Sequence, residues 1–431
     1  MAGKQSVDQR TKMLETPIPP LICSLAVPTI ISMLVTAIYN TADTYFVSQI
    51  NTSASGAVGI VFSVMAIIQA VGFTVGVGSG SIASRLLGQN KLEEANIYAT
   101  SGVLTALVLG TTLCLAGLCN LGDLMWMLGS TETIYPYARD YAFYILLGSP
   151  VMILSFTMNN LMRWQGKASL AVFGLDMGIA GAGAATLLSQ CFSMTFLFCL
   201  LISSKSDLKI RPRYISRSLG VYMAILKQGM PSFWRQGVLS IATMCLNYNA
   251  RLYGDAAVAA LAIVSKVFQI VNSIIIGFGQ GFQPVLGFNC GAGRMDRVKE
   301  AVVFSIKTCA IILTASAVVG FIFAPHIVTL FRDDPMVIDI GTRVFRRQAL
   351  VMPTFSVAVF SNMFFQSMGK SWRATILAIS RPGLLAVMSY LLTGLFELSG
   401  LVWAQASADL LAFVMSAAVM LHYFKYEFNQ T

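Results

Sequence analysis

Long uninterrupted apolar segments constrain this chain more than any other feature of its sequence. Segments 97–118, 181–203, 301–325 and 398–421 contain almost no charged residues. Each is long enough to cross the roughly 30 Å hydrocarbon core of a bilayer as a helix. A backbone in lipid satisfies its polar groups only in helices or closed barrels, and these segments are much longer than barrel strands. The sequence therefore predicts an all-α integral membrane protein with many spans.

Composition excludes several other classes of protein. Of the 431 residues 11% are charged, against about 25% in soluble domains. The eight cysteines lack metal-ligand spacing and there are only two histidines, so neither a zinc site nor an enzyme nor a cofactor is predicted. No nucleotide-binding motif is present, which argues against an ATP-driven pump. The excess of 29 Lys and Arg over 19 Asp and Glu fits loop orientation signals rather than nucleic-acid binding.

The chain aligns with itself when it is shifted by 203 residues. Pro28 then falls on Pro231, and Gly88 falls on Gly291. Further matches are Gly76 with Gly279, Gly78 with Gly281, Pro150 with Pro353, Asn159 with Asn362 and Gly166 with Gly369. Prolines and glycines have backbone roles that other residues replace poorly, so these matches indicate a true internal duplication. Internal repeats are typical of secondary transporters.

One helix of the first repeat is shorter than its counterpart. From Gly369 to Gly400 there are 31 residues, whereas from Gly166 to the equivalent Gly181 there are 15, so about 16 residues are absent. What remains near 167–178 is a stub at 168–175, worth about 15 Å as a helix, which is too short to cross a bilayer. The fifth helix of the first repeat is therefore predicted to be truncated.

The apolar pattern predicts two lobes in a twelve-helix plan. The predicted parts are a tail at 1–16, lobes at 17–203 and 220–425, a basic linker at 204–219 and a tail at 426–431. Predicted helices are 21–48, 56–86, 96–118, 136–162, 180–203, 220–250, 257–289, 300–325, 337–366, 373–396 and 400–424. Basic residues gather in alternate connections, which places both termini in the cytoplasm of a multi-pass plasma-membrane protein. Six helices per repeat make the two repeats parallel.

Several segments together resemble the multidrug and toxic compound extrusion (MATE) family over nearly the whole chain. They are Pro28 with 39–44, 163–166, 178–186, 229–233, 279–284, 289–294 and 380–383. The resemblance implies two six-helix lobes that export cationic amphipathic compounds in exchange for H⁺ or Na⁺. It also implies a cation site in the first lobe, of which Asp43 and Thr186 match. The family's Asn-x-x-x-Asp pair lies in the missing stretch, and its Asn has no counterpart here. Asp176 is either the surviving aspartate of that pair or, as its place two residues before Gly178 favours, a residue of the following loop.

The cation-coupling candidates lie at the end of the first predicted helix. Asp43 is a carboxylate inside a long apolar span, where a charge is costly and usually faces a cavity or a partner. The alternative is an interfacial residue at the end of the helix. Tyr39 and Asn40 lie within one turn of Asp43, so they either hydrogen-bond it or pack beside it. Thr186 is the fourth cation-coupling candidate. If the coupling ion is Na⁺, Asp43 is predicted to bind it; no other metal is predicted.

A second group of polar residues is predicted to line a substrate cleft: Gln69, Gln280, Gln283, Arg235 and Asp409. Helix–helix hydrogen bonds are the alternative for the glutamines. For Asp409 the alternative is a structural ion pair with Lys266 or Arg381.

The sequence thus predicts a monomeric, cation-coupled exporter of small cationic organic compounds that works by alternating access in the lipid bilayer. Two rivals remain open. One is a flippase for lipid-linked oligosaccharides, and the other is a non-transporting remnant with a shortened helix.

Overall fold

The structure, a computed structural model, describes residues 2–48, 52–128, 130, 132–167, 184–203 and 206–428. Within these ranges it describes only the backbone at 2–8, 38–48, 52–60, 184–190, 202 and 255. The predicted stub 168–175 and Asp176 lie outside the described residues. All regular elements of the described chain are helices, without a strand, which confirms the all-α prediction.

The helices of the first half are α1 (Ala2–Glu15), α2 (Ile18–Ser48), α3 (Thr52–Gly88), α4 (Leu92–Cys119), α5 (Leu121–Met127), α6 (Tyr135–Trp164) and α8 (Ala184–Ile202). Those of the second half are η1 (Pro212–Tyr214), α9 (Leu219–Arg251), α10 (Asp255–Gly291), α11 (Met295–Phe331), α12 (Pro335–Val351), η2 (Met352–Thr354), α13 (Phe355–Ser367) and α14 (Ser371–Tyr426). Among the described residues, 8 helical segments are long and apolar enough to span a membrane, with α12 to α13 counted as one. The chain is therefore a multi-pass membrane protein.

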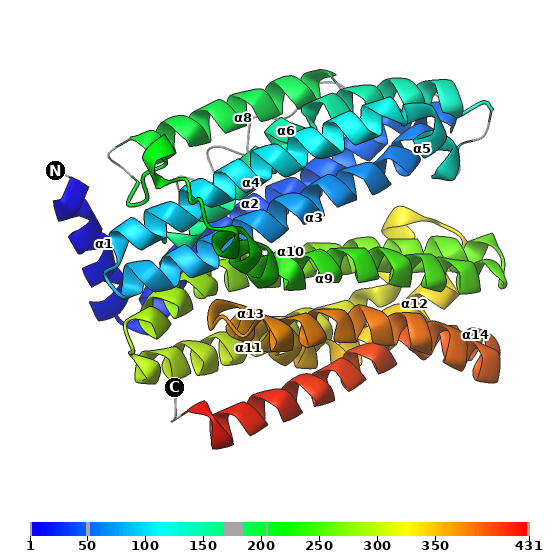
Figure 1. Ribbon diagram of the computed structural model, residues 1–431. Helices are drawn as coiled ribbons and strands as arrows, with labels where there is room; N and C mark the ends of the chain where they lie inside the picture. The colour runs from blue at the N-terminus through cyan, green and yellow to red at the C-terminus, as the bar shows by residue number, and fades with distance from the viewer. Residues whose placement is uncertain are drawn as a thin grey trace.

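Helix α14 is two membrane helices joined by a sharp bend. Its backbone leaves the helical region at Glu397, where φ is 52° and ψ is −134°. Gly400 fits the bend because a Cβ there would lie 1.8 Å from the Leu392 carbonyl oxygen. Figure 1 shows the two arms running back alongside each other, as the predicted helices 373–396 and 400–424 require. Sequence reasoning missed α1 and α5, because the first is polar and the second is only 7 residues long.

The two halves end their corresponding helices in the same way. Gly166 has a φ of 75° and Gly369, its repeat equivalent, has a φ of 81°. The residue after each glycine is a lysine whose backbone N–H donates a hydrogen bond back to the helix. Lys167 donates to the Met162 carbonyl at 3.1 Å, and Lys370 donates to the Phe365 carbonyl at 2.9 Å. A left-handed residue followed by this hydrogen bond is the Schellman motif, which glycine favours. The duplication seen in the sequence is thus also a duplication of backbone structure.

Among the described residues, three buried clusters hold the helices together. One lies among α3, α4 and α6 of the N-terminal lobe, defined as α2–α8, and another within the C-terminal lobe, α9–α14. The third joins both lobes, since Met13 and Ile22 share it with Phe282 and Phe364. It lies at the end of the molecule where α3 and α10 finish and where both chain termini are found (Figure 1). We call this the basic end, after Lys91, Lys167, Lys209, Arg294 and Lys370 in its connections.

Candidate functional site: the interface between the lobes

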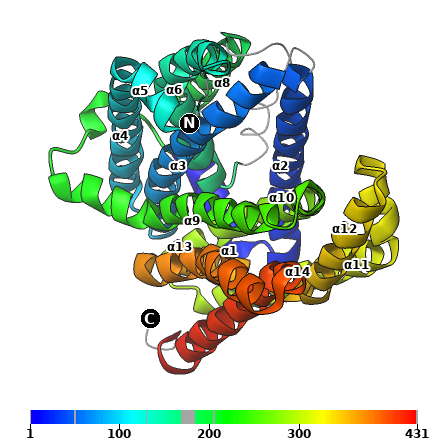
Figure 2. The ribbon, with the colours of Figure 1, turned by 90° about the vertical axis from the view of Figure 1, so that its right-hand side faces the viewer.

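The lobes meet where α3 crosses α9 and where α10 crosses α2 (Figure 2). A Cβ at Gly78 of α3 would lie 2.1 Å from the Ile225 carbonyl oxygen of α9. At the repeat-equivalent Gly281 of α10, a Cβ would lie 2.5 Å from the Ala26 nitrogen of α2. Small residues allow membrane helices to approach this closely. The two crossings are therefore equivalent, and they fix the centre of the interface.

The predicted cation-coupling residues lie on two helices of the N-terminal lobe. Tyr39, Asn40 and Asp43 belong to α2, and Thr186 belongs to α8. Their side chains lie outside those the structure describes. Their assignment therefore remains a prediction from the sequence.

Two of the predicted cleft residues lie between the lobes. Gln69 of α3 accepts a hydrogen bond from Gln236 Nε2 of α9 at 3.4 Å. Gln280 of α10 accepts one from Arg163 Nη1 of α6. Both hydrogen bonds join a helix of the N-terminal lobe to a helix of the C-terminal lobe. Both bonds must therefore break or rearrange if the lobes move relative to each other.

Arg163 is a buried cation at this interface that sequence reasoning did not single out. Its side chain is 3% exposed, and its Nη2 also donates to Ser32 Oγ of α2 at 3.4 Å. Its Nε has no partner among the described residues. Because the predicted helix 136–162 ends just before it, Arg163 falls in a basic connection in the sequence prediction. The 203-residue offset between the repeats could have indicated this buried position. It pairs Arg163 with Gln366, a polar residue that is also buried.

Gln283, by contrast, lies inside the C-terminal lobe. It is 6% exposed and donates to Gln366 Oε1 of α13 at 3.2 Å. Gln366 in turn donates to Ser232 Oγ of α9 at 3.0 Å. These contacts are the helix–helix hydrogen bonds that the sequence left open as the alternative to a cleft position.

Asp409 and Arg381 form an ion pair across the two arms of α14. Asp409 is 4% exposed and accepts from Arg381 Nε at 2.5 Å and from Gln348 of α12. The structure thus selects Arg381, and not Lys266, as the partner of Asp409; Lys266 is exposed on α10. Arg235 is half-buried on α9, and it makes no hydrogen bond or ion pair with another described residue.

Helix α1 lies across both lobes at the basic end. In the N-terminal lobe, Arg10 donates to the Gly88 carbonyl at 3.1 Å and Gln9 to the Gln165 carbonyl at 3.2 Å. In the C-terminal lobe, Asn289 Nδ2 donates to the Met13 carbonyl at 3.2 Å and Arg297 to the Thr16 carbonyl at 2.6 Å. The segment from Gln9 to Thr16 therefore ties the two lobes together here.

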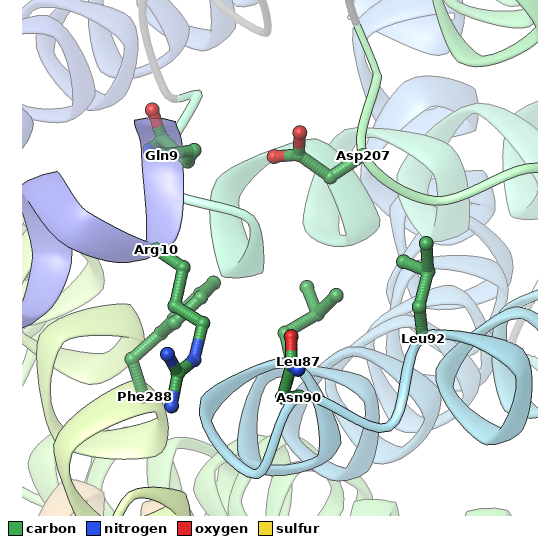
Figure 3. A pocket seen from close by; sticks show the side chains of 7 residues that line it. All are labelled: Gln9, Arg10, Leu87, Asn90, Leu92, Asp207 and Phe288. Atoms are coloured by element: carbon green, nitrogen blue, oxygen red, sulfur yellow. The ribbon is translucent and has the colours of Figure 1, made fainter. Parts of the chain in front are cut away.

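Figure 3 shows the small space left beside α1, between Arg10, Leu87 and Asp207. Its volume of about 40 Å³ is room for little more than a water molecule. Burial raises the pKa of Asp207, and Lys167, 2.9 Å away, acts in the opposite direction. A cavity of this size holds no drug-sized compound, and the buried cluster shared by both lobes closes the basic end among the described residues.

Comparison with known proteins identifies relatives over most of the chain. The family model MatE matches residues 28–179 and 231–391, two segments that begin 203 residues apart. Multidrug export protein MepA of Staphylococcus haemolyticus is 23% identical over 403 residues, which cover 89% of each protein. MepA of Staphylococcus aureus is 23% identical over 430 residues, which cover 95% of this chain and 94% of that protein.

Solved structures share the fold. One, described as the outward-facing conformation of a multidrug resistance MATE family transporter, has a TM-score of 0.91 and 24% identity, with 98% of this chain and 99% of that chain covered. Another, a transporter of the MOP superfamily from Pyrococcus furiosus described as having a binding pocket of reverse polarity, has a TM-score of 0.88 and 24% identity, with 96% and 98% covered.

Proposed function

This chain belongs to the MatE family, whose members are transporters and not enzymes, and we propose that it exports cationic amphipathic compounds in exchange for H⁺ or Na⁺. The names of its relatives, multidrug export proteins, support the export of drugs. Export from the cell calls for a position in the plasma membrane, and the basic connections favour both termini in the cytoplasm.

The equivalent crossings of α3 with α9 and of α10 with α2 are the observation that carries this proposal. Two parallel repeats that touch through equivalent contacts are able to rock as rigid bodies about that interface. Closure at the basic end leaves the opposite side as the side of release. In the proposal Asp43 binds the coupling cation, and its occupancy shifts the balance between the two orientations of the lobes.

Efflux from proteoliposomes tests the proposal. A cationic dye is loaded, a pH or Na⁺ gradient is applied, and wild type is compared with Asp43→Asn and with Asp123→Asn, which removes an exposed carboxylate of α5. We expect gradient-driven efflux in wild type and Asp123→Asn, and its loss in Asp43→Asn. An anionic dye is run in parallel because Arg163, the buried charge between the lobes, is a cation.

Other outcomes of the efflux experiment would contradict a particular part of the proposal. Efflux of the anionic dye alone contradicts the substrate class. Equal efflux by wild type and Asp43→Asn contradicts the coupling site. No efflux from folded wild type favours the non-transporting alternative, and flipping of a lipid-linked sugar in its place favours the flippase.

A further inference from the structure

An apolar groove runs between α10, α11 and α12 in the C-terminal lobe. Its volume is about 370 Å³, and Ser316 is the one polar side chain in its lining. The floor is aromatic, since the rings of Phe268 and Phe345 lie 5.3 Å apart. Gly320 lets the Phe345 ring pack closely against α11, because a Cβ at that position would lie 2.5 Å from the Cε1 atom of the ring. The groove is thus formed by the packing of three helices.

The groove lies along candidate membrane spans, in the half of the molecule away from the basic end. All three helices belong to candidate membrane spans. Its α10 lining, 267–271, is closer to the start of α10 at Asp255 than to its end at Gly291. Val319 of α11 lines it and is 55% exposed, so the groove is open at its side. In Figure 2, α11 and α12 lie at the margin of the molecule, where lipid surrounds a membrane protein.

Arg346 lies beside this groove, directly after Phe345. It is exposed, its Nε donates to the Phe321 carbonyl at 3.3 Å, and its guanidinium lies 5.3 Å from the centre of the Phe321 ring. It makes no ion pair with any carboxylate that the structure describes. By contrast Arg343, one turn earlier, pairs with Asp339. A charge at membrane depth is costly unless it meets water or an opposite charge, so an anionic group outside the protein would stabilise Arg346.

We propose that this groove binds a phospholipid of the adjacent leaflet, with one acyl chain in the groove and the phosphate on Arg346. The 370 Å³ of the groove equals about a dozen water-sized volumes of roughly 30 Å³ each. That space is enough for most of one acyl chain. Arginine suits phosphate because two parallel N–H groups of its planar guanidinium reach two oxygens. The apolar groove and the cation meet where Gly320 and Phe321 contact Phe345 and Arg346. One molecule with an apolar chain and an anionic head satisfies both.

Native mass spectrometry of the full chain tests this site without any measurement of transport, so its result is independent of the proposed function. The probes are phosphatidylglycerol and diacylglycerol with the same acyl chains, which differ by the phosphate headgroup. Val319→Trp fills the groove, and Val318→Trp is its matched control, 53% exposed but outside the lining. Arg346→Gln removes the phosphate partner, and Arg343→Gln is the control on the same helix. Thermal unfolding midpoints establish that each variant is folded.

We expect wild type and both controls to retain phosphatidylglycerol. Val319→Trp should lose both lipids, whereas Arg346→Gln should lose about tenfold in its preference for phosphatidylglycerol over diacylglycerol, the effect of one charge-assisted hydrogen bond. Equal retention by Val319→Trp and Val318→Trp would overturn the groove as the site. If Arg346→Gln and Arg343→Gln show the same preference for phosphatidylglycerol over diacylglycerol, the phosphate contact is overturned. Displacement of the lipid by the transported dye would assign the groove to the transport pathway instead.

Discussion

Gly88 and Gly291 occupy equivalent positions in the two repeats, and each lies against a backbone carbonyl of the other's helix. A Cβ at Gly88 would come within 2.2 Å of the Phe288 oxygen, and a Cβ at Gly291 within 2.0 Å of the Arg85 oxygen. Arg85 and Phe288 are themselves 203 residues apart. A pseudo-two-fold axis therefore passes between the ends of α3 and α10, which is the relation expected of parallel repeats.

Adding one methyl group at either position should separate the lobes at the basic end. We expect Gly88→Ala and Gly291→Ala each to lower stability by about 1–3 kcal/mol, since a Cβ has no room beside a carbonyl. Thermal unfolding in detergent measures the effect. Gly237→Ala is the control, because no atom lies within 4 Å of its Cβ position on α9. A loss at Gly237 equal to that at Gly88 would contradict the explanation from close packing.

The hydrogen bond between Arg163 and Gln280 should show energetic coupling between the lobes. Gln280→Leu leaves a buried guanidinium with Ser32 as its one described hydrogen-bond acceptor, and we expect a cost of about 1.5–3 kcal/mol. Adding Arg163→Met to Gln280→Leu should recover part of that loss, because a buried polar pair replaced by apolar residues is often neutral. A double-mutant cycle of unfolding free energies measures the coupling. Strictly additive losses would show that the two side chains do not interact.

The sequence predicted the helices and their duplication because both depend on local patterns. Apolar length gave the spans, and glycines such as Gly166 and Gly369 marked equivalent helix ends. Tertiary contacts were harder to predict. Asp409 had two possible partners in the sequence, and only the bend at Glu397 brings Arg381 to it. The polar helix α1 contains no long apolar segment, since the buried Met13 and side-chain hydrogen bonds to backbone carbonyls of distant helices hold it in place.

The ion pair of Asp409 with Arg381 should support the fold of the C-terminal lobe. Arg381→Met leaves a buried carboxylate with Gln348 alone, and we expect a loss of about 3–5 kcal/mol in stability. Asp409→Asn should cost less, because Arg381 is 31% exposed and reaches water. Unfolding midpoints show which of the two variants is less stable. Loss of dye efflux in Asp409→Asn at unchanged stability would instead assign Asp409 to the transport pathway.

Glu427, which follows the last helix, should make stability depend on acid pH. Its carboxylate accepts from Arg373 Nη1 at 2.9 Å, and this hydrogen bond lowers its pKa below the ordinary value of 4.5. A lowered pKa means that the pair stabilises the folded state above pH 4.5 and that this contribution is lost as pH falls through the folded value. We expect the difference in unfolding midpoint between wild type and Glu427→Gln to vanish in that acid range. Glu300→Gln, which removes an exposed glutamate of α11, should show no such convergence.

The connection between α1 and the C-terminal lobe depends on Asn289. Its Nδ2 donates to the Met13 carbonyl, and its Oδ1 accepts from Arg297 Nε at 2.9 Å, which positions Arg297 on the Thr16 carbonyl. Asn289→Leu removes the donor and the acceptor together. Because each such bond contributes about 0.5–1.5 kcal/mol, we expect amide hydrogen exchange in 10–16 to rise about tenfold.

The same variant separates two roles for α1. If α1 holds the lobes together at the basic end, exchange should also rise at the ends of α3 and α10, near Gly88 and Gly291. Asn247→Leu, at an exposed position of α9, is the control and should leave all these amides unchanged. Faster exchange confined to α1 would mean that α1 covers the closed end without holding it, and that the contacts of Gly88 and Gly291 suffice to keep it closed.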